Sequence, residues 1–453
     1  MSGGLFFRPT DFAHMKIAYL TAGAGGMYCG SCMRDNTLVA ALRRRKRDVM
    51  LIPVYSPIRV DEEDVSEDTV YYGGINVYLQ QKSAVFRHTP KVVDRLLNSP
   101  GLLRRAMKKS GSASQDDLAQ LTISILSGDD GAQRKELDKL VEGLRPHAFD
   151  LVHLPNALFV GLAKGLRERL GVRVVCTLTG EDIFIDKLPD APRKRVVDLI
   201  RQRASDVDAF IAVTRYYAGY AVEQYGIPKD RVHHVPLGVR LDYESDSEKM
   251  SFMSGSDMFT IGYFARICPE KGLHVLCEAF AQLRKAGRDC RLKIGGYCGA
   301  SDRAYFDDIK NQMNGLKLND AIEYDGELDR EEKLRFLRSL DVLSVPTVYR
   351  EAKGLYVLEA MAQGVAVVQP RHGSFPELVE ATGGGVLVNP NDPADLARAL
   401  AAMMDDLPAC HRMGEAGQDV VAKSFTDSAM ADAAWAVFEG VLAARKGGTA
   451  VVR

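Results

Sequence analysis

The second half of the chain alternates between short apolar runs and stretches with helical periodicity, and this alternation constrains the fold more than any other feature. The apolar runs have the length of buried strands, and they are residues 259–266, 291–296, 321–325, 341–346, 365–370 and 385–389. Strands that are each followed by a helix pair in parallel, and their right-handed crossovers place helices on the faces of the sheet. The pattern therefore predicts an α/β domain with a Rossmann-like parallel sheet.

The first part of the chain shows a second alternation of the same kind. Its apolar runs, expected to form another parallel sheet, are residues 16–22, 49–55, 149–155, 172–179, 209–213 and 232–236. Residues 56–148 interrupt this rhythm and read as an irregular insertion. Within it we expect a strand at 74–79 and short helices at 92–97, 102–107 and 118–126.

Length and composition set the outer limits. A chain of 453 residues is too long for one hydrophobic core, so we expect domains at 1–245 and 258–426, joined by a polar linker at 246–257. The apolar share of 46% is that of an ordinary globular protein, and a net charge of −1 argues against nucleic-acid binding. The absence of a long apolar run, the lack of a signal-peptide pattern and eight scattered cysteines together predict a cytoplasmic protein.

Two carboxylates mark one turn of the second alternation. Glu351 follows the apolar run 341–346, and Glu359 lies in the next stretch, where Leu355 and Leu358 fall at helical spacing. Glu351 is thus expected just before a helix N-terminus and Glu359 inside that helix. The free N–H groups of a helix start favour an anion, whereas carboxylates accept hydrogen bonds from hydroxyls. This is the chemistry of a nucleotide-sugar site, although two solvated glutamates on an ordinary helix would give the same pattern.

Two cations bracket an earlier turn of the same alternation. Arg266 ends the run 259–266, and Lys271 precedes the helical stretch 273–283. A guanidinium binds phosphate oxygens as a two-pronged fork, and an ammonium binds them as a compact charge. The pair therefore suits a diphosphate.

Together with the stretch 363–377, these residues resemble the GT-B glycosyltransferases of family four, whose members carry such an Arg and Lys and two glutamates separated by seven residues. The resemblance implies two Rossmann-like domains facing each other across a cleft, with the donor held by the second. It also implies a C-terminal helix, within 427–453, that crosses back to the first domain. The implied reaction moves a hexose-type sugar, with retention, from a nucleoside diphosphate to an unidentified acceptor. No metal or other cofactor is expected, because protein cations would stabilise the leaving group.

The resemblance assigns roles to individual residues. Arg266, Lys271 and Glu351 are the catalytic candidates: the two cations would face the leaving diphosphate, and Glu351 would contact the donor sugar. Glu359 would hold the ribose. The other donor-binding candidates lie at a helix start, at strand ends and in the first glycine loop: Lys353, Gly354, Leu355, Gly296, Gly326, Leu328, Gly25 and Gly26. Lys353 stands where the family usually has Phe, so the sugar-facing surface is altered here.

The acceptor-side candidates come from the first domain. Glu181 and Asp182 follow the run 172–179, at the strand end where α/β sheets bind ligands, and a helix cap explains Asp182 equally well. Thr179 stands near the place where similar proteins often carry His, and Thr cannot hold a proton's charge. Tyr28 belongs to the first glycine loop.

Two alternatives concern that loop. A dinucleotide-binding G-x-G-x-x-G fails because Tyr28 occupies the last glycine's place, and the run 49–55 has no acidic residue at its end for a ribose. Cys29 and Cys32 form a C-x-x-C pair that could be redox-active, while zinc would need two more ligands. We favour small loop residues that shape the acceptor site.

A rival of a different class is a catalytically silent, nucleotide-sugar-binding regulatory protein. Because the chain has both the two cations and the two glutamates, we favour an enzyme over this alternative. The acceptor, whether a small molecule, a glycan or a lipid-linked group, is not identified by the sequence. Homo-oligomerisation and weak peripheral membrane contact through the basic residues of 104–109 also stay open, while a cover over the acceptor is our preferred role for that segment.

Overall fold

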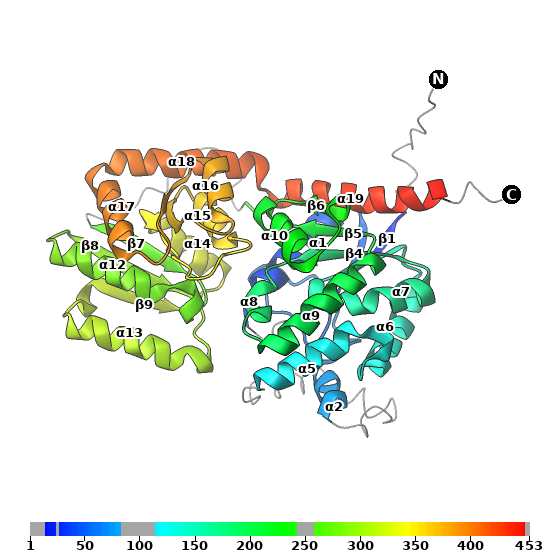
Figure 1. The fold of residues 1–453 in the computed structure, drawn as a ribbon. Coiled ribbons are helices and arrows are strands. Elements are labelled where there is room, and N and C mark those ends of the chain that lie inside the picture. The colour runs from blue at the N-terminus through cyan, green and yellow to red at the C-terminus, as the bar shows by residue number, and fades with distance from the viewer. Residues whose placement is uncertain (1–13, 24–26, 83–113, 242–257, 449–453) are drawn as a thin grey trace. The chain divides into compact units, whose positions relative to one another are not determined.

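The computed structural model describes residues 14–23, 27–82, 114–241 and 258–448. They form two compact units, Met1–Pro236 together with Ser428–Arg453, and Leu237–Asp427 (Figure 1). Each unit holds one six-stranded sheet in which every strand pairs in parallel with its neighbours. The two parallel α/β sheets predicted from the apolar runs are thus confirmed.

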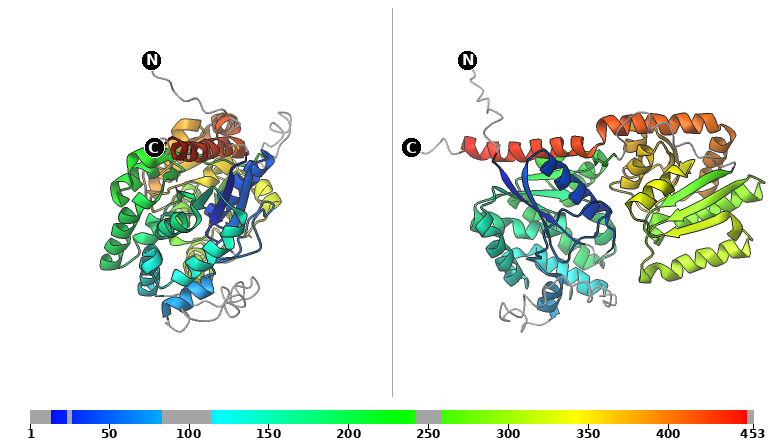
Figure 2. Two further views of the ribbon diagram at one scale, coloured as in Figure 1. Left: turned by 90° about the vertical axis from the view of Figure 1, so that its right-hand side faces the viewer. Right: turned by 180° about the vertical axis from the view of Figure 1, so that it is seen from behind.

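The sheet of unit 1 has the strand order β2-β1-β3-β4-β5-β6. Its strands are β1 (Lys16–Thr21), β2 (Asp48–Pro53), β3 (Leu151–Leu154), β4 (Arg173–Leu178), β5 (Ala209–Ala212) and β6 (Val232–His234). The connecting helices include α1 (Gly30–Arg44), α7 (Ala163–Leu170), α8 (Asp182–Ile185), α9 (Asp190–Arg203) and α10 (Arg215–Tyr225). Figure 1 shows α9 in front of the sheet, and α1 comes forward when the molecule is seen from behind in Figure 2.

The segment between β2 and β3 is helical in its described part. It contains α2 (Gly74–Lys82), α5 (Gln115–Leu126) and α6 (Arg134–Leu144). The strand predicted at 74–79 is therefore wrong, whereas the helix predicted at 118–126 is confirmed. Asn76, Val77 and Gln80 are buried at helical spacing, and Gln80 donates a 2.7 Å hydrogen bond to Glu136 of α6, so tertiary contacts override the local β preference. The helices predicted at 92–97 and 102–107 lie outside the described residues.

The last helix, α19 (Asp427–Gly448), belongs to the core of unit 1. Its residues Met430, Ala434 and Phe438 are buried in one cluster with Ile17 of β1 and Leu38 of α1. Figure 2 shows α19 in red alongside the rest of unit 1. None of the helices in the described ranges combines the length and the apolar character needed to cross a membrane.

The sheet of unit 2 has the order β12-β11-β10-β7-β8-β9. Its strands are β7 (Phe259–Phe264), β8 (Cys290–Gly295), β9 (Ile322–Gly326), β10 (Val342–Leu343), β11 (Ala366–Pro370) and β12 (Gly385–Val388). The chain moves outward from β7 through β8 to β9 and, in the opposite direction, from β10 through β11 to β12. The order therefore reverses between the adjacent strands β7 and β10, and ligands of such sheets bind where the order reverses, beyond the strands' carboxyl ends.

The helices of unit 2 follow its strands in the expected rhythm. They are α12 (Leu273–Lys285), α13 (Arg303–Gly315), α14 (Arg330–Arg338), α15 (Leu355–Ala362), α16 (Phe375–Thr382), α17 (Pro393–Asp405) and α18 (Leu407–Ser424). Helix α18 has no counterpart among the sequence predictions. It approaches the chain before β11 so closely that a Cβ added at Gly414 would lie 2.0 Å from the Gly364 carbonyl oxygen.

Candidate active site

The turns that follow β7 and β10 meet at the point where the strand order of unit 2 reverses. The Val348 amide, after β10, donates a 3.0 Å hydrogen bond to the Glu270 carbonyl, after β7. Gly272 has a positive φ of 70°, and a Cβ there would lie 1.9 Å from the Pro346 carbonyl oxygen. The glycine is required because the two backbones touch. This contact fixes Lys271, which immediately precedes Gly272.

Lys271 and Glu351 form an ion pair across these two turns. The Lys271 Nζ lies 2.5 Å from Glu351 Oε2, which also accepts hydrogen bonds from the hydroxyls of Tyr349 at 2.7 Å and Tyr356 at 3.2 Å. Burial alone would raise the pKa of the Glu351 carboxyl, but the Lys271 charge and the hydrogen bonds from Lys271 and Tyr349 lower that pKa to about 2. Lys271 also lies over the rings of Tyr349 and Tyr356, with its Nζ 5.2 and 4.9 Å from their centroids. Neither tyrosine was predicted as a site residue, although they lie only two and five residues from Glu351.

Residues of the stretch 363–377 hold the backbone around Glu351 in place. The Ser374 amide donates a 2.7 Å hydrogen bond to the Glu351 carbonyl, and a Cβ at Gly373 would lie 2.4 Å from that same oxygen. On the other side, the Lys353 amide donates to Glu351 Oε1 at 3.2 Å. The Glu351 carboxylate therefore has protein partners on both oxygens, and the residue is buried.

Helix α15 begins directly after this carboxylate, as predicted. Gly354 is its N-cap with a positive φ of 74°, and Leu355 is its first residue. The N–H groups of a first helical turn have no partners within the helix, so they are available to an anion together with the positive end of the helix dipole. Arg266 lies at the end of the neighbouring β7, exposed, with its Nε and Nη2 both 3.4 Å from Cys268 Sγ.

Glu359 lies inside α15, as predicted, and is paired with a lysine that the sequence analysis missed. Its Oε1 lies 2.7 Å from the Nζ of Lys333 on α14, whose side chain is 4% exposed. The surrounding sequence of α14 is rich in charged residues and reads as a solvated helix. The available signal was the spacing of Lys333 from the buried Phe336 and Leu337, which places it on the apolar face.

Three of the donor-binding candidates, Gly296, Gly326 and Leu328, lie at the ends of β8 and β9. The Gly296 amide donates a 2.7 Å hydrogen bond to the Gly326 carbonyl, and a Cβ at Gly296 would lie 1.9 Å from the Ala265 carbonyl oxygen. Leu328 is half-buried just beyond β9. The ends of β7, β8 and β9 are thus in contact, on the same side of the sheet as Lys271.

In unit 1 the candidates separate into several environments. Gly25 and Gly26 lie outside the described residues. Tyr28 has the Arg59 guanidinium 4.3 Å above its ring. Cys29 is the partly exposed N-cap of α1 and Cys32 is buried in its first turn; contact with Cys29, then burial, raises the pKa of Cys32 well above its usual value. A raised pKa disfavours a reactive thiolate at Cys32.

Thr179, Glu181 and Asp182 follow β4 and are all buried. The Glu181 carboxylate accepts hydrogen bonds from the amides of Ala157, Thr179 and Gly180 and from the Tyr217 hydroxyl: 3.0, 3.1, 3.1 and 2.7 Å. These bonds use both of its oxygens and hold the loop that follows β4. Asp182 differs, since its buried Oδ1 has no hydrogen-bond partner and burial raises its pKa to about 6.

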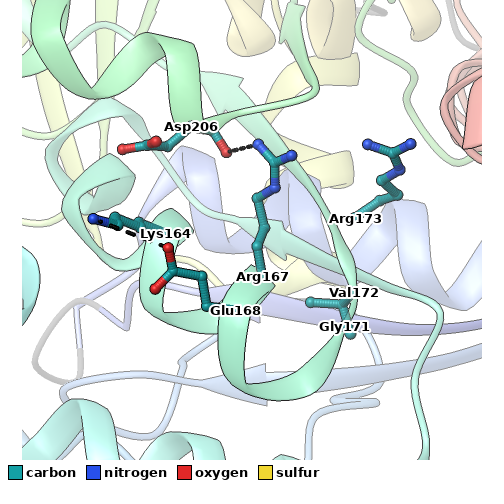
Figure 3. A pocket seen from close by; sticks show the side chains of 7 residues that line it. All are labelled: Lys164, Arg167, Glu168, Gly171, Val172, Arg173 and Asp206. Atoms are coloured by element: carbon teal, nitrogen blue, oxygen red, sulfur yellow. Dashed lines mark hydrogen bonds and ion pairs between the residues drawn. The ribbon is translucent and has the colours of Figure 1, made fainter.

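A surface hollow of about 450 Å³ lies at the other end of β4 (Figure 3). It is lined by Lys164, Arg167, Glu168, Gly171, Val172, Arg173 and Asp206. Arg167 donates to the Asp206 carbonyl at 2.9 Å, and Arg173 pairs with Asp208 at 2.7 Å, so these cations have partners within unit 1. The hollow adjoins the amino end of β4, whereas the candidate residues follow carboxyl ends, so we do not assign it to the active site.

The chain contains two α/β units, each with a six-stranded parallel sheet, and cations pair with carboxylates where the strand order of the second sheet reverses. These features define a glycosyltransferase of the GT-B class. The family described as Glycosyl transferases group 1 matches residues 246–420, and Glycosyltransferase Family 4 matches residues 130–243. The chain belongs to the family 4 glycosyltransferases.

Relatives and solved structures agree with this assignment. The chain is 31% identical to a D-inositol 3-phosphate glycosyltransferase of Nocardia farcinica, covering 76% of this chain and 79% of the relative. A protein of Catenulispora acidiphila with the same activity name is also 31% identical, covering 77% of this chain and 85% of the relative. By structure, sucrose-phosphate synthase of Thermosynechococcus elongatus has a TM-score of 0.69 at 18% identity, covering 95% of this chain and all of that one. Anabaena HepE in complex with UDP has a TM-score of 0.65 at 16% identity, covering 94% and 100%.

Proposed function

We propose that this glycosyltransferase moves a hexose-type sugar, with retention, from a nucleoside diphosphate sugar held mainly by the domain of residues 258–426. The observation that carries the proposal is the Lys271–Glu351 pair at the reversal of the unit 2 strand order, beside the N-terminus of α15. Cationic groups fixed before the reaction cost no reorganisation when charge develops on a leaving diphosphate. The domain of residues 1–245 would supply the acceptor side.

Each site residue has a role in this scheme. Arg266 and Lys271 neutralise the leaving diphosphate, and the first-turn amides of α15 add their dipole. Because these charges belong to the protein, we propose that transfer needs no metal. Glu351 orients Lys271 and stays ionised at neutral pH. Its contact with the donor sugar, the role implied by resemblance, requires one of its present hydrogen bonds to be exchanged for a sugar hydroxyl.

On the acceptor side we propose Thr179, Glu181, Asp182 and Tyr28, with Asp182 the strongest candidate because of its unpartnered buried oxygen. We place the reaction in the cytoplasm, where nucleotide sugars would meet the enzyme. The relatives named above make inositol 3-phosphate the first acceptor to test, and the UDP-bound structural neighbour makes UDP-sugars the first donors.

A thermal-shift screen with UDP-, GDP- and ADP-sugars should identify the donor, since a ligand that binds only the folded protein raises its Tm. Turnover of that donor is then compared between the parent and Lys271→Ala. We expect a folded variant whose turnover is lower by about a hundredfold or more. The matched control is Lys285→Ala, at the exposed end of α12, which should keep parental turnover. Unchanged kcat/KM in a folded Lys271→Ala would remove Lys271 from the mechanism.

A further inference from the structure

The family resemblance treats Glu351 and Glu359 as a pair, but their carboxylates differ in how many of their oxygens have hydrogen-bond partners. Glu351 has protein partners on both carboxylate oxygens, and its side chain is 4% exposed. The side chain of Glu359 is 14% exposed, and its Oε1 binds Lys333 at 2.7 Å. Among the described residues, no hydrogen bond reaches Oε2 of Glu359. Glu359 is therefore fixed by one oxygen and open at the other.

The fixing group is unusual for its position. Lys333 comes from α14, 26 residues before Glu359 in the chain, and its ammonium is almost completely buried. Lysine is rarely buried unless paired, because its charge loses hydration, and buried ion pairs seldom repay that cost in stability. If packing were the only requirement, a hydrophobic residue would serve at this position on the apolar face beside Phe336 and Leu337. The buried charge thus calls for a role in holding Glu359.

The geometry of the pair limits what Glu359 can bind. A carboxylate held through one oxygen has lost much of its side-chain freedom, so a ligand that binds the other oxygen pays less entropy. Ionised carboxylates accept hydrogen bonds and donate none, so the ligand group must be a donor such as a hydroxyl. The adjoining helix start favours an anionic group, which places a hydroxyl-bearing neighbour of a diphosphate within this part of unit 2.

We propose that Lys333 is a positioning residue that holds Glu359 through Oε1, so that Oε2 accepts a hydrogen bond from a ribose hydroxyl of the bound nucleoside diphosphate. This inference rests on the proposed function, since it assumes a nucleotide donor. Lys333 does not touch the nucleotide itself. Its contribution is to hold the Glu359 carboxylate in place.

The test measures binding of UDP, GDP and ADP by calorimetry, together with the counterparts lacking the 2′- or the 3′-hydroxyl. For the nucleotide that the parent binds best, Glu359→Gln and Lys333→Met should each weaken binding by about tenfold, the effect of one hydrogen bond to a charged group. One of the deoxy counterparts should bind parent and variants within about twofold. Lys333→Arg, which keeps the charge, should recover most of the affinity. The matched control is Lys310→Met, on the exposed face of α13, which should change nothing.

The outcomes separate this inference from the proposed function. If the parent binds none of the three nucleotides, the proposed function is overturned and this inference with it. If the parent binds but Lys333→Met weakens the ribonucleotide and both deoxy counterparts equally, Lys333 is merely structural and the inference alone is overturned. Should Lys333→Met fail to fold, the same comparison is made with Lys333→Arg and Glu359→Gln. Equal loss of all three ligands in Glu359→Gln would again overturn it.

Discussion

Replacing Glu351 by Gln should destabilise unit 2 by an amount that the electrostatics of the site predict. The carboxyl pKa falls from 4.5 to about 2 on folding. A difference of roughly 2.5 units corresponds to about 3 kcal/mol of stability that the ionised form supplies and a neutral amide does not. Because the folded pKa is the lower one, this stability is present above about pH 4.5 and is lost as the pH falls toward 2.

Urea unfolding at a series of pH values measures this contribution. Far-UV circular dichroism follows both units, while fluorescence of Trp435, the one tryptophan of the chain, reports unit 1. We expect Glu351→Gln to shift the circular-dichroism transition at pH 7 by the equivalent of about 3 kcal/mol, and by roughly half of that at pH 3. Glu415→Gln, on the exposed surface of α18, is the matched control and should shift neither signal.

A double-mutant cycle with Lys271→Met completes the experiment. Removing one partner of a buried pair leaves an uncompensated charge, whereas removing both leaves none. The double variant Lys271→Met/Glu351→Gln should therefore be clearly more stable than the sum of the single changes implies. A Glu351→Gln variant as stable as the parent at pH 7, or a deficit that does not change with pH, would refute the electrostatic account.

Three further predictions concern the metal, Asp182 and the cysteine pair. Transfer should continue in excess chelator, because the stabilising charges are side chains; complete loss of activity that magnesium or manganese restores would contradict this. Asp182→Asn should raise the Tm at pH 7.5 but not at pH 4, since the raised pKa of about 6 means that ionisation between about pH 4 and 6 costs stability; an equal shift at both pH values would show that burial of its charge is not the cause. Cys29→Ser with Cys32→Ser should leave turnover within a fewfold of the parent, and a rate that responds to reductant in the parent but not in the variant would establish a redox role instead.

The sequence predicted those features that depend on neighbouring residues. The start of α15 at Leu355 and the position of Glu351 before it follow from a short apolar run, a glycine and helical spacing, which lie close together in the sequence. Lys271 and Glu351, 80 residues apart, were assigned to one site only through the family resemblance, and the ion pair between them was not predicted.

What the sequence did not predict depends on contacts between distant segments. In the sequence, Lys333 is one of several charged residues in a polar helix. Its pairing with Glu359 depends on the contact between α14 and α15, which the sequence does not show. Helix α18 was missed because Gly414 and Gly417, which allow its close contacts, weaken the helical pattern locally. The same holds for α2, where buried Asn76 and Gln80 interrupt the apolar periodicity that would have indicated a helix.

Because α19 supplies Met430, Ala434 and Phe438 to the core of unit 1, that core is completed only after unit 2 has been synthesised. A ribosome adds about 5–20 residues per second, so the residues of unit 2, Leu237–Asp427, separate the two portions of unit 1 by about 10–40 s of synthesis. During that interval the apolar surface of β1 and α1 is not yet covered by α19. The nascent first unit therefore exposes apolar surface while unit 2 is synthesised, and a chain cut short before residue 428 would expose the same surface permanently.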